Sequence, residues 1–112
     1  MTPASYELVA LRLAVLLKRT SKARARVSEK TLRLLSGRST LREAFLSTVR
    51  AHLEDLNVTF VRLDRGGFAL IATSALEGAP PALVKNLMPN FKTLSDHDLW
   101  NELEPTNDIL DE

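Results

Sequence analysis

The residues in this chain that could perform catalysis are few and poorly placed for it. The sequence contains no cysteine, which excludes thiol nucleophiles, disulfides and cysteine-ligated metal centres. His97 lies between Asp96 and Asp98, with Glu102 close behind, and these residue types bind metal ions. Neighbouring residues of a helix point in different directions, however, so these side chains do not converge on one ion. His52 falls near the buried edge of an amphipathic segment and is interpreted as structural.

Sequence motifs for nucleotide binding or nucleophilic catalysis are also missing. The four glycines provide neither a phosphate-binding loop nor a dinucleotide fingerprint. No local motif marks a nucleophilic serine. We therefore expect a protein without enzymatic activity, without a cofactor and without a metal ion.

Charge is distributed unevenly along the 112 residues, although the formal net charge is only +1. Residues 1–50 contain eleven Lys or Arg against three Glu, whereas residues 75–112 contain two Lys against eight acidic residues. A basic half joined to an acidic tail indicates different partners for the two ends. One hypothesis is that the tail competes with the partner of the basic half. The alternative is a tail that only increases solubility.

The longest apolar stretch, Leu8–Leu17, is interrupted by Arg12 and is too short to cross a bilayer. Its flanking positive charges, Lys18 and Arg19, follow the apolar residues, whereas in an export signal they come first. Together with the absence of cysteine, this pattern predicts a cytoplasmic, intracellular protein without a membrane partner.

The first predicted helix covers residues 4–19, with Thr2 as its N-cap and Pro3 at its first position. Its apolar residues form more than one stripe, so we expect this helix to make contacts on two sides. The second contact is either the C-terminal segment or another subunit. Residues 20–26 follow as a polar, basic loop.

Two further helices are predicted on either side of a tight turn at Gly37. Ser28 is a suitable N-cap for a short helix that ends before this glycine. Thr40 and Glu43 have the spacing of a capping box, which predicts a longer helix from there to Leu56.

After Asn57 the apolar period changes to two residues, which is typical of β-strands. Residues 58–63 and 68–73 are rich in β-branched and aromatic side chains. The turn residues 64–67 between them complete the pattern of a β-hairpin.

The expected fold is therefore α+β and mainly helical, with three helices, a two-stranded hairpin and a C-terminal helical extension. Two short helices are predicted in the extension, over residues 81–88 and 96–104. We expect residues 1–76 to form one domain and residues 77–105 to form the extension, which packs on the domain or on a partner. Residues 106–112 are expected to be a mobile acidic tail.

This succession of elements resembles the winged-helix form of the helix-turn-helix domain. The resemblance covers residues 6–73 and rests on element order, loop lengths and the glycine-rich hairpin tip. It implies that the third helix enters the major groove of double-stranded DNA, while the hairpin tip, or wing, touches the backbone or the minor groove. The DNA contacts that it implies are Arg38, Ser39, Thr40, Arg42, Ser47 and Arg50 around the third helix, Arg62 and Arg65 in the wing, and Lys22, Arg24 and Arg26 in the basic loop.

These residue types suit both parts of such an interface. Arg can bond guanine through two donors, and Ser or Thr can bond bases or phosphates. Each Lys or Arg that neutralises a phosphate releases a counterion. The resemblance implies a small transcriptional regulator that acts as a homodimer, because a domain of this size reads few base pairs alone. The expected dimer surface combines the first helix with the segment around Leu99, Trp100 and Leu103.

A winged-helix module that binds another protein instead of DNA is the alternative, because a fold does not fix a function. The surface charge distinguishes the DNA-binding hypothesis from the protein-binding hypothesis. A continuous positive face over the third helix, the wing and the basic loop favours DNA. A basic face interrupted by Glu43, Glu54 and Asp55 favours a protein partner.

Overall fold

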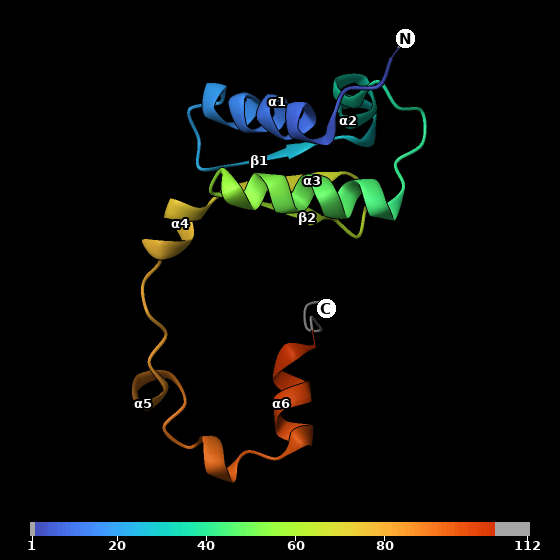
Figure 1. The fold of residues 1–112 in the computed structure, drawn as a ribbon. Helices are drawn as coiled ribbons and strands as arrows, with labels where there is room; N and C mark the ends of the chain where they lie inside the picture. The colour runs from blue at the N-terminus through green and yellow to red at the C-terminus, as the bar shows by residue number, and fades with distance from the viewer. Residues whose placement is uncertain (1, 105–112) are drawn as a thin grey trace, which may run out of the picture. The chain divides into compact units, whose positions relative to one another are not determined.

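The computed structural model describes residues 2–104 and divides into two compact units after Ala79 (Figure 1). The first contains α1, β1, α2, α3, β2, β3 and α4 in chain order, and the second contains α5, η1 and α6. No helix within residues 2–104 combines the length and the apolar character that crossing a bilayer requires. The predicted acidic tail, residues 106–112, lies outside the described residues.

Helix α1 (Tyr6–Arg19) begins later than the sequence pattern predicts. Its N-cap is Ser5, whose side chain accepts a hydrogen bond from the backbone N–H of Leu8. The prediction of Thr2 as the cap is wrong because Ala4 is occupied by tertiary contacts. Its N–H donates to the carbonyl of Ser36, so this segment stays extended against the end of α2.

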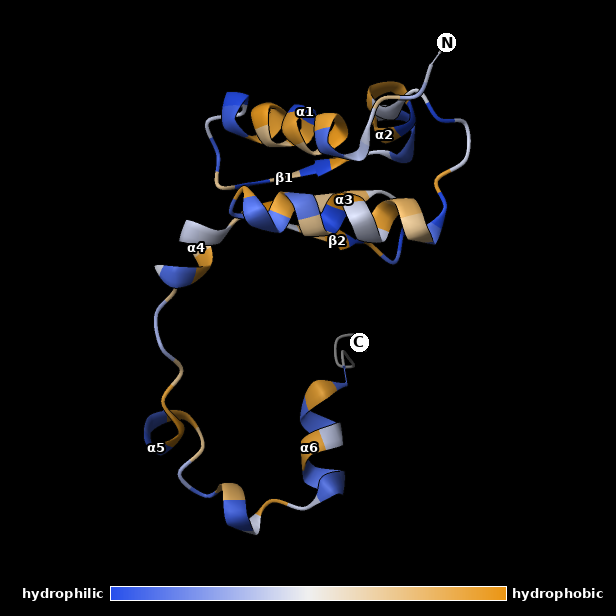
Figure 2. Cartoon of the chain, viewed as in Figure 1, coloured by the Kyte–Doolittle hydropathy of each residue, from blue (hydrophilic) through white to orange (hydrophobic). Residues whose placement is uncertain are grey.

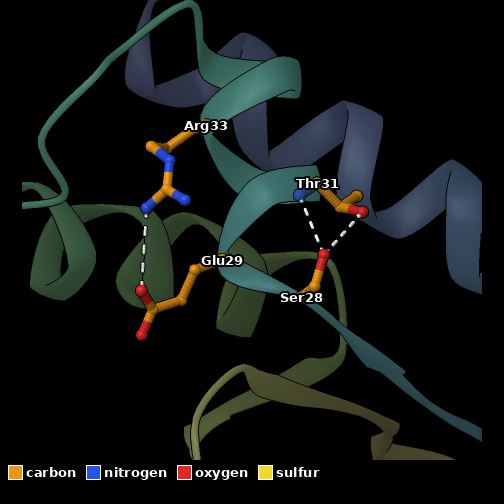
Figure 3. A network of polar contacts seen from close by, with 4 residues as sticks. All are labelled: Ser28, Glu29, Thr31 and Arg33. Atoms are coloured by element: carbon orange, nitrogen blue, oxygen red, sulfur yellow. Dashed lines mark hydrogen bonds and ion pairs between the residues drawn. The ribbon is translucent and has the colours of Figure 1, made fainter.

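Helix α2 (Glu29–Ser36) has the boundaries that its sequence predicts. The Ser28 hydroxyl accepts from the Thr31 N–H at 3.0 Å, and an ion pair of 3.6 Å joins Glu29 to Arg33 one turn away (Figure 3). Gly37 ends the helix in the left-handed conformation, with φ of 69°, as expected for a glycine in this position.

Helix α3 (Glu43–Asp55) starts three residues after the predicted cap. Its N-cap is Arg42, which makes no side-chain capping bond, so the predicted capping box of Thr40 with Glu43 is wrong. Leu41 is partly buried against the core and draws the preceding chain inward. The helix ends as predicted, with Asn57 in a left-handed conformation at φ of 63°.

The sheet has three antiparallel strands in the order β1–β3–β2. Strands β2 (Val58–Arg62) and β3 (Phe68–Ala72) are the predicted hairpin, shorter by one residue each. Strand β1 (Arg24–Val27) pairs with β3 and corrects the prediction that residues 20–26 form only a loop. Its short basic sequence has no strand pattern of its own. The segment is extended because its backbone pairs with the edge of β3.

The hairpin tip is held close to the end of β1 by a glycine. Gly66 and Gly67 both have positive φ, at 101° and 81°. A Cβ on Gly67 would lie 2.9 Å from the carbonyl oxygen of Val27. Only a residue without a side chain therefore allows this approach of the two backbones.

One hydrophobic core joins the helices to a single face of the sheet (Figure 2). The buried residues alternate along the strands, so that Phe60, Phe68 and Leu70 face α1 and α3. The α+β class predicted from the sequence is confirmed. The helices contribute to this core Val9, Ala10, Leu13, Leu17, Leu32, Phe45, Leu46, Val49 and Leu53.

Four short helices follow the sheet. Helix α4 (Thr73–Glu77), which the sequence pattern did not predict, ends the first unit. The second unit contains α5 (Val84–Leu87), the 3-10 helix η1 (Phe91–Thr93) and α6 (Asp96–Leu103). Helix α6 is close to its predicted range and begins with a capping box between Ser95 and Asp98.

Candidate nucleic-acid interface

Arg38 precedes α3, but its side chain points into the fold. Its guanidinium carbon lies 5.1 Å from the ring centre of Tyr6 and 4.6 Å from that of Phe45. Its Nη2 donates to the carbonyl of Ala4 at 2.9 Å, and its buried Nε has no hydrogen-bond partner among the described residues. The expectation that Arg38 is exposed is wrong, because these contacts use its charge to fasten the start of α1 to α3.

Arg50 is also held within the fold, at the open edge of β2. The pair Leu63 and Gly67 forms a backbone bond across the hairpin, so the carbonyl of Phe60 points away from β3. The Nε of Arg50 donates to that carbonyl at 3.0 Å, and its guanidinium lies 5.8 Å from the Phe60 ring centre. Arg50 therefore supplies the hydrogen-bond donor for a backbone carbonyl at the edge of β2, contrary to the expectation of an exposed side chain.

Three of the predicted contact residues gather where the chain enters α3. Ser39, Thr40 and Arg42 are exposed and line one groove of about 390 Å³, whose floor includes Arg38 and Phe45. The first N–H groups of α3 have no side-chain cap here, because Arg42 makes none. The free N–H groups and the positive end of the helix dipole favour an anion such as a phosphate at this position.

The tip end of the hairpin lies beside the same end of α3. Arg62 of β2 forms an ion pair of 3.8 Å with Glu43, the first residue of α3. Both side chains are largely exposed, so water and salt weaken this pair. Ser47 is exposed one turn farther along α3. The structure thus brings Arg42, Ser47 and Arg62 to one surface, with a carboxylate among them.

Arg24 and Arg26 lie on a different surface. They alternate along β1 with Ala25 and Val27, and Val27 is buried in the core, so both arginines are on the outer face of the sheet. Their cross-strand neighbours on β3 are Ile71 and Ala69. The outer face is opposite to the face that α3 covers, so the sheet divides the basic residues of β1 from those at α3, and the continuous positive face that would favour DNA is not formed.

The remaining two predicted contacts are exposed at turns. Arg65 is in the turn between β2 and β3, where the winged-helix resemblance expects the wing tip. Lys22 is between α1 and β1 and lines a groove beside α1. The exposed side of α3 also carries Glu43, Glu54 and Asp55, which reduce its positive charge.

A second surface of the first unit is apolar and lies on α1, the helix for which the sequence predicts contacts on two sides. Leu11 and Val15 border two grooves of about 440 Å³ and 410 Å³ on the two sides of the helix. The high apolar content of α1 was the available signal, but it did not indicate which side of the helix stays uncovered. The structure leaves Leu11 and Val15 exposed to 42% and 44%.

Metal binding has no support within the described residues, 2–104, where no three candidate ligands cluster. In comparisons with known proteins, no family model, no curated protein and no solved structure matches this chain.

Proposed function

We propose that residues 2–79 form a winged helix that binds double-stranded DNA through the N-terminal end of α3 and the β2–β3 hairpin. The observation that carries the proposal is the order of elements, α1–β1–α2–α3–β2–β3, with the sheet order β1–β3–β2. In this order α2 and α3 are joined by a turn and the β2–β3 hairpin follows α3, which is the order of elements in a winged helix-turn-helix domain. We infer that the protein is a transcriptional regulator in the cytoplasm, a role that needs no catalytic residue.

Charge supports a polyanionic partner for this unit. Residues 2–79 contain thirteen Lys or Arg against seven Asp or Glu. This surplus attracts DNA from a distance and is independent of base sequence. The proposed contacts are the exposed residues at the end of α3 and on the hairpin, namely Ser39, Thr40, Arg42, Ser47, Arg62 and Arg65. Arg38 and Arg50 are not among them, because their guanidinium groups are used within the fold.

The arginines of β1, together with Lys22, belong to this proposal only as a secondary contact. The outer face of the sheet does not adjoin the exposed side of α3. A bound duplex reaches Arg24 and Arg26 only where it bends or extends past the hairpin. We therefore expect their replacement to weaken binding less than replacement of Arg42 or Arg65.

The proposal is tested by titrating a fluorescently labelled duplex with the full chain at two salt concentrations. Binding that weakens as salt rises is expected, since each phosphate contact adds about 0.9 to the slope of log K against log salt. The variants Arg42→Ala and Arg65→Ala should each reduce this slope by about 1. Lys30→Ala, an exposed position on α2, is the matched control. Absence of binding at low salt, or equal effects of all three variants, would contradict the proposed interface.

A protein partner is the second candidate, and the acidic residues of α3 favour it. Glu43, Glu54 and Asp55 interrupt the basic face, as expected for a winged-helix module that binds protein. The same titration separates the candidates. If the chain folds but does not bind duplex DNA at low salt, the result favours a module that binds another protein.

A further inference from the structure

The side of α1 that faces away from the core is apolar. Three aliphatic residues, Leu8, Leu11 and Val15, are spaced three and four positions apart and are exposed to 39%, 42% and 44%. This spacing places them on one stripe of the helix. The core-facing residues of α1 form a second stripe, so α1 is apolar on two sides. Figure 2 shows the apolar colour over much of the ribbon of this helix. A helix of this kind is typical of an element covered on both sides.

Two grooves run along the two sides of this stripe, and their charged borders have one sign. The first has an apolar floor completed by Leu35, and its charged residues are Arg12 and Arg19. The second extends to Leu56 and Val58, and its charged residues are Lys18 and Lys22. A ligand for this surface therefore needs apolar side chains and negative charge together.

Helix α6 has this combination. Leu99, Trp100 and Leu103 are exposed to 37%, 68% and 73%. Around them on α6 are three acidic residues, Asp96, Asp98 and Glu102, and no basic residue other than His97. Among residues 80–104 of the second unit, none is buried. A helix of eight residues without a core is marginal in water, so α6 needs an apolar surface outside its own unit.

We propose that the outer face of α1 binds α6 of a second copy of this chain, in a reciprocal exchange. Leu99, Trp100 and Leu103 of one copy cover Leu11 and Val15 of the other, and the acidic residues of α6 face the basic borders of the grooves. One chain carries both complementary surfaces, and reciprocal use of them closes the assembly about a two-fold axis. The inference does not rest on DNA binding.

Trp100 provides a direct readout, because it is the only tryptophan in the sequence. Its fluorescence emission should be blue-shifted at micromolar protein and should move to the red on dilution to nanomolar. Over the same range, the mass measured by light scattering or sedimentation should fall from a dimer to the 12.5 kDa monomer. A blue-shifted emission at every concentration with a monomer mass would place α6 on its own chain and overturn the exchange. A red-shifted emission at every concentration would overturn the docking itself, whatever the mass.

Substitutions separate this surface from other apolar surfaces of the chain. Leu11→Glu and Leu103→Glu should each raise the dimer dissociation constant at least tenfold and shift the emission of Trp100 to the red. Val61→Glu is the matched control, since Val61 is an aliphatic residue on β2 with 40% exposure. Leu103 lies in a unit without buried residues among positions 80–104, so its replacement leaves the core of the first unit intact. Dimerisation that survives both variants, or that is lost equally in Val61→Glu, would contradict the proposal.

Discussion

The guanidinium carbon of Arg38 lies 4.6 Å from the centre of the Phe45 ring, which joins the turn after α2 to the first turns of α3. The same guanidinium donates to the carbonyl of Ala4, so one side chain links the chain start, the turn and α3. The surface at the N-terminal end of α3 is therefore supported from below by a side chain that is held inside the fold.

Replacing Arg38 by Ala should lower the free energy of unfolding by about 1–3 kcal/mol, because two ring contacts and a partly buried hydrogen bond are lost together. The variant Arg38→Lys should recover little of this free energy of unfolding, since an ammonium group cannot stack on a ring as a planar guanidinium does. Urea unfolding followed by circular dichroism measures the change. Arg42→Ala, which removes an exposed arginine of the same surface, is the control and should stay within about 0.5 kcal/mol. Equal stability of both variants would show that the clamp at Arg38 contributes nothing.

Arg38 also shows where sequence reasoning fails in this chain. An arginine in a polar turn before an amphipathic helix has the pattern of an exposed residue. Its inward direction depends on Tyr6 and Phe45, which are far from it in sequence or on the next element. The predicted N-terminal ends of α1 and α3 are wrong for the same reason. Ala4 and Leu41 are held by tertiary contacts, so α1 and α3 begin after them and the local capping signals are not used.

Elements whose signals are local were predicted well. Ser28 and Gly37 bound α2, Asn57 ends α3, and the alternating strands with their glycine turn form the hairpin. Strand β1 was missed because its order comes from pairing with β3, which is more than forty residues away in sequence. Within the candidate site, the sequence predicts the exposed group Ser39, Thr40 and Arg42 at the N-terminal end of α3. It did not predict that the sheet separates this group from Arg24 and Arg26.

Replacement by Ala should have unequal effects at the two N-caps that the sequence predicts, Ser28 and Thr40. Ser28→Ala should destabilise the protein by about 1 kcal/mol, because its hydroxyl caps α2 at the N–H of Thr31. Thr40→Ala should have little effect, because the described contacts give its side chain no capping role at α3. Thermal or urea unfolding of the two variants checks this difference. A larger loss for Thr40→Ala would restore the capping box that the sequence pattern indicates.

Arg50 contributes to the open edge of β2, and its replacement by Met isolates that contribution. Met keeps the apolar stem but leaves the carbonyl of Phe60 without its donor, which should cost about 1 kcal/mol of stability. The exposed strand edge should also increase aggregation during refolding. Ser47→Ala, on the exposed side of α3, is the control. If Arg50→Met matches Ser47→Ala in stability and in light scattering on refolding, the bond to Phe60 does not protect the edge.

The two glycines of the hairpin tip allow conformational strain to be separated from crowding. Both have positive φ, so an alanine at either position should cost about 1 kcal/mol through the left-handed backbone alone. At Gly66 the added Cβ meets nothing within 4 Å, whereas at Gly67 it lies 2.9 Å from the carbonyl of Val27. Gly67→Ala should therefore be the more destabilising variant by about 1 kcal/mol or more, since backbone atoms of β1 must move to admit the methyl group. Urea unfolding of the two variants measures the difference directly. Equal losses would mean that the hairpin tip moves away from β1 without cost, and that this contact does not fix the position of Arg65.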